Sequence, residues 1–333
     1  MYKEIGLTNL DYMLSPKKQA TLNFHGQYYL DSDKLESYLH FRKDSMQYFY
    51  DCYLENLGYL RGLSFEELYK ITGCQFQPFN KIYQLYDDLI RGRIARATDF
   101  LMIPEYLMYK LTGKKAKEYT NAVTTGLVNA TKGEYESYII NSLGLPQQLF
   151  PQLKKPKTQL GCLLPEIAEK VGGNTKVVLC ATHDTASAVE GMRIGLNQPY
   201  ISSGTWSLLG IKRNEPLTDE NSFSSNFSNE GGIGYIRYQK NIMGMWLIQE
   251  LRKELCPDKS FDEIVEMAES SKFNELIDAD AEILLSPISM KSAFDSLLNS
   301  ENKLSSADYF RCAYRSLAES YSKAVIELEK TQV

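Results

Sequence analysis

The chain has 333 residues, of which 43% are hydrophobic and 24% charged, and its net charge is −5. This length is enough for two domains of ordinary size with a sizeable core. The acidic balance argues against a nucleic-acid partner, because binding to phosphates needs a basic face. Lysine and arginine are scattered along the chain, so a membrane-surface patch is not expected either.

The cellular compartment is indicated by features that the sequence lacks. The N-terminal segment MYKEIGLTNLDYMLSPKK has no apolar run of signal-peptide length. No apolar stretch reaches the roughly 18 residues that a membrane helix needs. The six cysteines show no C-x-x-C spacing, which favours reduced thiols over a disulfide framework. We therefore expect a cytoplasmic protein.

The first half of the chain is predicted to be mainly helical. Asp and Ser open two expected helices, over 31–41 and 44–57, in an N-terminal segment whose role the sequence does not reveal. A third helix is expected after Ser64, because Glu67 completes a capping box and Gly73 supplies a stop. Apolar residues at helical spacing predict further helices within 79–92, 99–113, 135–150 and 165–171.

The pattern changes near residue 174, so we predict two domains, 1–172 and 173–333. The run TKVVLCA (175–181) predicts a buried strand, and a helix is expected to follow it. The mixture of strands and helices in the second domain indicates an α/β order. The remaining predictions are strands within 198–213, with a turn at Ser203–Gly204, a strand over 232–240, and helices over 241–255, 261–271 and 306–331.

His183 and Asp184 form the first candidate site. They fall where a predicted strand ends and a helix begins, and ligands of α/β proteins bind outside the carboxyl ends of strands. The helix dipole would keep the Asp184 carboxylate ionised and ready to accept a proton, and His183 would donate a hydrogen bond to a substrate hydroxyl. The alternative is an N-cap aspartate beside a loop histidine whose hydrogen bonds are satisfied.

Two later segments supply further candidates. The turn at Gly204 and Thr205 suits a phosphate, because backbone N–H groups and hydroxyls meet there without a side chain at the glycine. A plain hairpin turn is the alternative. Asn241 is predicted to open and cap a helix, with Gln249 about two turns further on. A cap and a surface amide would explain these two residues equally well.

The segments THDTASAV, SSGTWSLLG, NFSNEGG and KNIMGMWLIQ follow one another in this order. Together with EELYKITGCQFQPFNKIYQL, LMIPEYLMYKLTG and EYTNAVTTGL in the first half, they resemble the rhamnulokinases among the FGGY-type carbohydrate kinases. The resemblance runs from about Leu63 to the C-terminus. It implies a two-domain α/β sugar kinase fold of the actin-like ATPase (ribonuclease H-like) type.

The resemblance also implies a reaction and the residues that perform it. ATP would phosphorylate a ketose, L-rhamnulose, to its 1-phosphate in rhamnose catabolism, with Mg²⁺ neutralising charge during in-line phosphoryl transfer. Asp184 would be the general base that takes the proton of the primary hydroxyl. The implied sugar contacts are His183, Asp184, Thr185 and Asn241. The implied nucleotide contacts are Gly204, Thr205 and Gln249.

The sequence departs from the family pattern at both ends. No string of the type D-x-G-x-x-x-x-R, the family's phosphate loop, occurs in it, and it stops at Val333, before the glycine-rich loop that holds adenosine. We therefore expect an incomplete version of the fold. Two alternatives stay open: a catalytically silent sugar-binding remnant, and a kinase for another ketose such as L-fuculose or L-xylulose. The sequence does not set the oligomeric state.

Overall fold

The computed structural model describes residues 21–23, 26–28, 49, 51, 59–77, 80–285, 287–298 and 304–331. The chain forms two compact units, the first made of Met1–Gly195 with Arg213–Tyr238 and the second of Leu196–Lys212 with Gln239–Val333. The helices expected over 31–41 and 44–57 lie outside the described residues, apart from Phe49 and Asp51. The domain boundary predicted at residue 172 stays a prediction.

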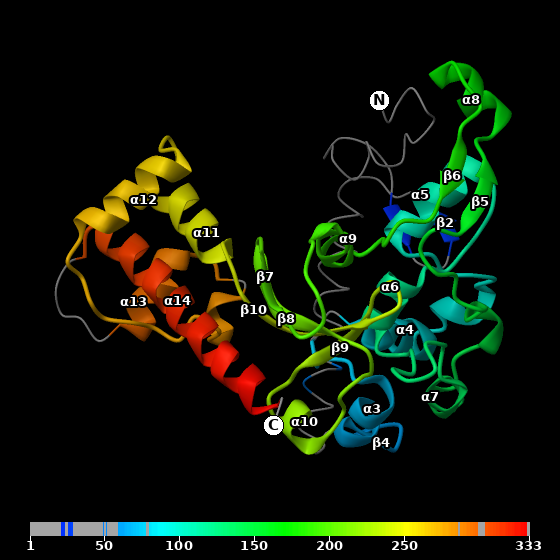
Figure 1. Ribbon diagram of the computed structural model, residues 1–333, viewed down its shortest axis with the longest axis horizontal. Helices are drawn as coiled ribbons and strands as arrows, with labels where there is room; N and C mark the ends of the chain where they lie inside the picture. Colours follow the sequence, from blue (N-terminus) through cyan, green and yellow to red (C-terminus); the bar gives the residue numbers. More distant parts are fainter. Residues whose placement is uncertain are drawn as a thin grey trace. The chain divides into compact units, whose positions relative to one another are not determined.

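The first unit is mainly helical, with short two-stranded sheets (Figure 1). Its helices are α3 (Phe65–Thr72), α4 (Lys81–Ile90), η1 (Arg93–Arg96), α5 (Ile103–Thr112), α6 (Tyr119–Ala122), η2 (Val123–Thr125), α7 (Ser137–Leu143), η3 (Gln147–Leu149), α8 (Pro165–Val171), α9 (Asp184–Gly191) and α10 (Glu220–Ser224). Its strands are β1 (Thr21–Asn23), β2 (Gly26–Tyr28), β3 (Tyr59–Leu60), β4 (Leu63–Ser64), β5 (Gln159–Cys162), β6 (Lys176–Val178) and β9 (Ser228–Gly231).

Helix α3 confirms the local prediction at both ends. The Ser64 side chain accepts a hydrogen bond from the Glu67 N–H, which forms the expected capping box. Gly73 ends the helix with a φ of 58°, a left-handed conformation that favours glycine. The apolar face of α3 joins a core with α4 and α7, in which Leu68, Leu85 and Ile139 are buried.

The strand predicted over 175–181 forms, but the prediction that it is buried is wrong. Strand β6 covers Lys176–Val178 and pairs with β5 in a two-stranded sheet, and Val178 is 48% exposed. The buried apolar residues of this run, Leu179 and Ala181, come after the strand. A β-branched run marks a strand, but burial needs a covering layer that local sequence does not report.

The second unit contains a sheet formed by β7 (Pro199–Ser203), β8 (Trp206–Arg213) and β10 (Ile236–Met243). Strands β7 and β8 are antiparallel, with Ile201 opposite Leu209, and β8 lies between β7 and β10. The predicted hairpin is therefore confirmed, and its turn at Gly204–Thr205 lies one residue later than expected. Strand β10 begins in the first unit, where it neighbours β9, and continues into the second.

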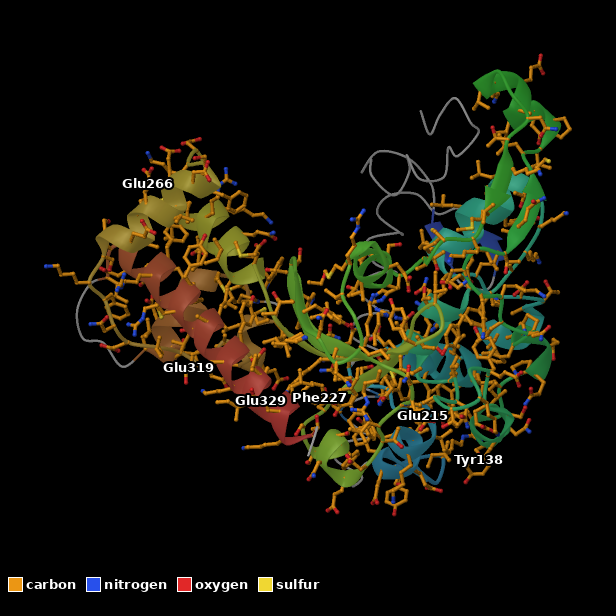
Figure 2. All side chains as sticks on the ribbon, in the orientation of Figure 1. Tyr138, Glu215, Phe227, Glu266, Glu319 and Glu329 are labelled. Carbon is orange, nitrogen blue, oxygen red and sulfur yellow. The ribbon has the colours of Figure 1, made fainter. Side chains whose placement is uncertain are left out.

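Helices form the rest of the second unit: α11 (Trp246–Leu255), α12 (Phe261–Ser270), η4 (Glu282–Leu284), α13 (Met290–Leu297) and α14 (Ser306–Lys330). The long helix α14 packs against α12 and α11, and α11 also packs against α13 (Figure 1). Leu251, Phe294 and Phe310 are fully buried among them. Charged side chains on the outer faces, such as Glu266 on α12 and Glu319 on α14, stay exposed (Figure 2).

The helix predicted over 241–255 begins later than expected, and the prediction that Asn241 caps it is wrong. Asn241 lies inside strand β10, and α11 starts at Trp246 with Met245 at its N-cap. The strand continues because Ile242 and Met243 are buried in the second unit. Among the described residues, no helix is both long enough and apolar enough to cross a membrane.

Candidate active site

The loop before α9 is held by side chains on both of its flanks. The Thr182 N–H and hydroxyl both donate to Glu118 Oε2, at 3.1 and 2.7 Å. From the helix side, the Ser187 hydroxyl donates to the Ala181 carbonyl. These bonds fix the backbone immediately before His183 and Asp184.

Asp184 is the first residue of α9, and His183 is its N-cap. One Asp184 carboxylate oxygen, Oδ1, accepts from the Thr185 N–H at 2.6 Å and from its hydroxyl at 3.3 Å. The side chain of Asp184 is 95% exposed, whereas Thr185 is buried. The carboxylate therefore lies at the N-terminus of α9, where the helix dipole favours negative charge, with one oxygen bonded to Thr185 and the side chain open to solvent.

His183 lies against a buried ion pair. Its Nδ1 atom is 3.3 Å from Arg237 Nη1 and 3.4 Å from Glu230 Oε2. Glu230 Oε2 and Arg237 Nη2 are 3.1 Å apart, and the Arg237 side chain is completely buried. The other ring nitrogen, Nε2, is 3.6 Å from Asp184 Oδ1. A partly exposed histidine is thus fixed between a buried pair and an exposed carboxylate.

The two glycines after Glu230 make room for aromatic rings. A Cβ added to Gly231 would lie 2.1 Å from the Tyr119 ring, and one added to Gly232 would lie 2.4 Å from the Tyr235 ring. The Gly232 N–H donates to the Tyr235 carbonyl at 2.9 Å, which closes the turn between β9 and β10. Burial raises the pKa of the Tyr119 phenol, and the nearby Arg237 charge opposes that rise.

Glu118 is the centre of a second buried network. Besides Thr182, its carboxylate accepts from the Thr120 N–H at 2.8 Å, the Thr120 hydroxyl at 2.6 Å and the Asn121 N–H at 3.2 Å. Its own N–H donates to Glu105 Oε1 at 2.7 Å. Burial raises the pKa of the Glu105 carboxyl to about 7. This network joins the start of α6 to the loop that carries His183.

The predicted phosphate turn lies in the second unit, on the start of α11. The carbonyls of Gly204 and Thr205 accept from the N–H groups of Met245 and Trp246, at 2.8 and 3.2 Å. The Gly204 N–H donates within the turn to the Trp206 carbonyl at 2.9 Å. Both turn residues are exposed. The turn carbonyls, which would repel a phosphate, therefore bond to the helix instead.

The seven predicted site residues fall into two sets, each within one unit. His183, Asp184 and Thr185 are consecutive and in contact in the first unit. The second unit holds the other set: Gly204, Thr205, Asn241 and Gln249. Gln249 is half-buried on α11, the helix on whose first residues the turn rests. Asn241 is half-buried in β10.

The residue types present fit a nucleotide that brings its own metal. Across the residues that the structure describes, no group of three or more His, Cys, Asp or Glu side chains is arranged to hold a metal ion. Mg²⁺ in kinases is held largely by substrate phosphates and water, so a cage of protein ligands is not required. At the turn, Gly204 presents no side chain and Thr205 an exposed hydroxyl.

Sequence reasoning missed Glu118, Glu230 and Arg237. Each is almost completely buried, and two of them stand in strands: Glu230 in β9 and Arg237 in β10. A charged residue inside a strand that packs into a core is costly unless it is paired. For Glu230 and Arg237, the position among strand-forming residues was the available signal, but the pairing partners are visible only in three dimensions.

Comparison with solved structures identifies the fold. The ligand-bound xylulose kinase from Lactobacillus acidophilus superposes with a TM-score of 0.66 at 15% identity, over 85% of this chain and 58% of that one. A glycerol kinase from Plasmodium falciparum with ADP gives a TM-score of 0.59 at 12% identity, over 86% and 57%. The described part therefore has the two-domain sugar kinase fold of the actin-like ATPase type.

The sequence assigns the chain to a family with that fold. Residues 56–191 match the N-terminal domain, and residues 199–333 the C-terminal domain, of the FGGY family of carbohydrate kinases. The chain belongs to this family. It is 40% identical to a rhamnulokinase of Oceanobacillus iheyensis over 274 residues, and 40% identical to one of Enterococcus faecalis over 280. It covers 58% and 56% of those two proteins, which match 80% and 82% of this chain.

Proposed function

We propose that this chain binds L-rhamnulose and takes part in its ATP-dependent phosphorylation at the 1-position. The observation that carries the proposal is the exposed Asp184 carboxylate, which lies 3.6 Å from Nε2 of His183 at the start of α9. The similarity to rhamnulokinases selects the ketose. Because the chain spans little more than half of those relatives, the activity of the whole protein is part of the proposal.

Asp184 is the general base in this proposal. Its carboxylate accepts the proton of the sugar's primary hydroxyl as that oxygen attacks the terminal phosphorus of ATP. The donors from Thr185 occupy Oδ1, which directs the remaining oxygen, Oδ2, toward the hydroxyl. His183 donates a hydrogen bond to the sugar and orients it, and Thr185 and Asn241 complete the proposed sugar contacts.

Gly204, Thr205 and Gln249 are the proposed nucleotide contacts. When bound, Mg²⁺ supplies charge neutralisation on the transferred phosphoryl group. The Thr205 hydroxyl would donate to a phosphate oxygen, and the half-buried Gln249 amide would contact the nucleotide. A cytoplasmic location stays a prediction from the sequence.

The experiment is an ATP-to-ADP coupled assay with L-rhamnulose and Mg²⁺, run on the chain and on Asp184→Asn. Removing a general base costs about 10²–10⁴-fold in kcat. We expect Asp184→Asn to lose activity by this factor with a nearly unchanged melting temperature, because the side chain is exposed. Asp258→Asn is the matched control, since it makes the same chemical change at an exposed turn residue of the second unit.

Equal turnover by the chain and by Asp184→Asn would overturn the role of Asp184. If neither protein turns over, the melting temperature with and without L-rhamnulose decides the next step. A sugar-dependent rise that Asp184→Asn weakens would leave the sugar site in place and assign the chain to the catalytically silent alternative. If L-rhamnulose does not raise the melting temperature at all, the proposal that the chain binds this sugar is rejected.

A further inference from the structure

The three contacts of the His183 ring specify which nitrogen carries its proton. A neutral imidazole donates from one nitrogen and accepts at the other. Arg237 Nη1 and Glu230 Oε2 lie 3.3 and 3.4 Å from Nδ1, on one side of the ring. On the other side, Asp184 Oδ1 lies 3.6 Å from Nε2. At Nδ1, the Arg237 donor and the Glu230 acceptor therefore favour opposite protonation states. At Nε2, the one contact among these three is the Asp184 acceptor.

The contacts at Nδ1 favour an unprotonated nitrogen that accepts a hydrogen bond from Arg237. A guanidinium only donates, so a protonated Nδ1 would place two N–H groups against each other. Glu230 Oε2 is closer to Arg237 Nη2, at 3.1 Å, than to the ring, which makes the ion pair its nearer contact. At Nε2, a proton faces the Asp184 carboxylate favourably, whereas a lone pair would be repelled by it. Both sides of the ring thus favour the proton on Nε2.

We propose that Arg237 is a positioning residue that fixes His183 as the neutral tautomer with its proton on Nε2. Two partners hold the arginine, the Gly231 carbonyl and the Glu230 carboxylate. Its Nε and Nη2 atoms both donate to the Gly231 carbonyl at 3.2 Å, and Glu230 balances its charge. The side chain is fully buried, and these contacts hold the planar guanidinium beside Nδ1 of the His183 ring.

The tautomer decides what the site offers to a ligand. Nε2 and Asp184 Oδ1 are 3.6 Å apart, which is too far for a hydrogen bond. With the proton on Nε2, His183 therefore presents a donor beside the Asp184 acceptor, and the two groups suit neighbouring sugar hydroxyls. With the proton on Nδ1, the site would present two acceptors, and a hydroxyl oxygen would lose its donor. This consequence rests on the proposed sugar kinase function, but the tautomer itself does not.

The experiment is a long-range ¹H–¹⁵N correlation spectrum of the histidine rings in the ¹⁵N-labelled chain without any ligand. The sequence contains three histidines, and the spectrum of His183→Gln identifies the signals of His183. At about pH 8, an imidazole of ordinary pKa is neutral. We expect a protonated Nε2 and an unprotonated Nδ1. A proton on Nδ1, or a doubly protonated ring, would overturn the proposal.

Two variants separate Arg237 from its partner. Arg237→Gln should shift the ring to a mixture of tautomers, whereas Glu230→Gln, which removes the competing carboxylate, should keep the proton on Nε2. Circular dichroism and the melting temperature establish that each variant is folded. A folded Arg237→Gln with an unchanged tautomer would contradict the assignment, and so would loss of the Nε2 proton in Glu230→Gln. If Arg237→Gln does not fold, the spectra of the unsubstituted chain and of Glu230→Gln test the tautomer assignment.

A binding measurement keeps this inference distinct from the proposed function. Calorimetric titration of L-rhamnulose should show about tenfold weaker binding to Arg237→Gln, because a sugar hydroxyl loses its donor. Full-strength binding by a folded Arg237→Gln with an altered tautomer would contradict the proposed consequence. Absence of sugar binding by every protein, with the Nε2 tautomer in place, would reject the proposed function and leave the tautomer assignment standing.

Discussion

The two regions that carry the predicted site residues are held in place by different means. In the first unit, the loop before Asp184 is held by buried charged side chains: Glu118 on the backbone and Arg237 on the His183 ring. In the second unit, the Gly204–Thr205 turn is held by backbone hydrogen bonds to the start of α11. The first region should therefore be sensitive to the loss of side-chain charge, and the second to added bulk.

The largest expected effect is that of Glu118→Ala. The substitution leaves the buried N–H groups of Thr120 and Asn121, and the partly buried N–H group of Thr182, without their acceptor. Losing one partner of a buried charged network costs about 3–5 kcal/mol, so the free energy of unfolding in urea should fall by this amount. Glu134→Ala, at an exposed position of the first unit, is the control and should have little effect. Equal stability of the two variants would contradict the claim that buried charged side chains hold the first region in place.

Gly244→Ala tests the backbone-held turn. The added Cβ would lie 2.6 Å from the Gly204 carbonyl oxygen and 2.7 Å from that of Thr205. Because backbone atoms cannot rotate away, we expect about 1–3 kcal/mol of destabilisation in chemical denaturation. Gly173→Ala is the control, since nothing lies within 4 Å of its added Cβ. Full stability of Gly244→Ala would show that the turn tolerates a shift away from α11.

The free energy of unfolding should depend on pH through Glu105, whose carboxylate accepts a hydrogen bond from the Glu118 N–H. Burial raises its pKa from 4.5 to about 7, so the folded state binds this proton more tightly than the unfolded state does. The stabilisation is complete below pH 4.5 and is lost as the pH rises to about 7. The loss should be about 1–3 kcal/mol.

Glu105→Gln checks this assignment in the same denaturation experiment. The amide does not titrate, so the fall in unfolding free energy between about pH 5 and 7 should become shallower. An unchanged slope would mean that another group titrates there.

The smallest effect is expected for a side-chain hydrogen bond of the second unit. The Ser207 hydroxyl lies 2.6 Å from the Tyr321 hydroxyl and joins β8 to α14. Ser207→Ala should cost about 1 kcal/mol, the usual net value of a neutral hydrogen bond. Adding Tyr321→Phe should cost little more, because the first substitution has already removed the partner. A loss as large as that of Glu118→Ala would show that both units depend on buried polar side chains.

Local signals predicted the elements that depend on local physics. The capping box at Ser64, the hairpin turn at Gly204 and the helix that starts at Asp184 were all predicted correctly. The resemblance of short segments predicted the family and the fold. The capping box, the hairpin turn and the helix start depend on residues that are close together in the chain, where caps and turn residues act directly.

Features that depend on distant contacts were missed or misjudged. Asn241 looked like a helix cap, but burial of Ile242 and Met243 extends β10 past it. Arg237 contacts His183 although 54 positions separate the two residues in the sequence, and its partner Glu230 is also distant in sequence. No local pattern reports such a contact.

The most direct test of the central claim is a calorimetric titration of the chain with L-rhamnulose, with L-fuculose and L-xylulose as comparison sugars. The account predicts saturable binding of L-rhamnulose that is stronger than that of the other two ketoses and is weakened in His183→Ala. Binding that is equal for all three sugars, or that does not change in His183→Ala, would contradict it.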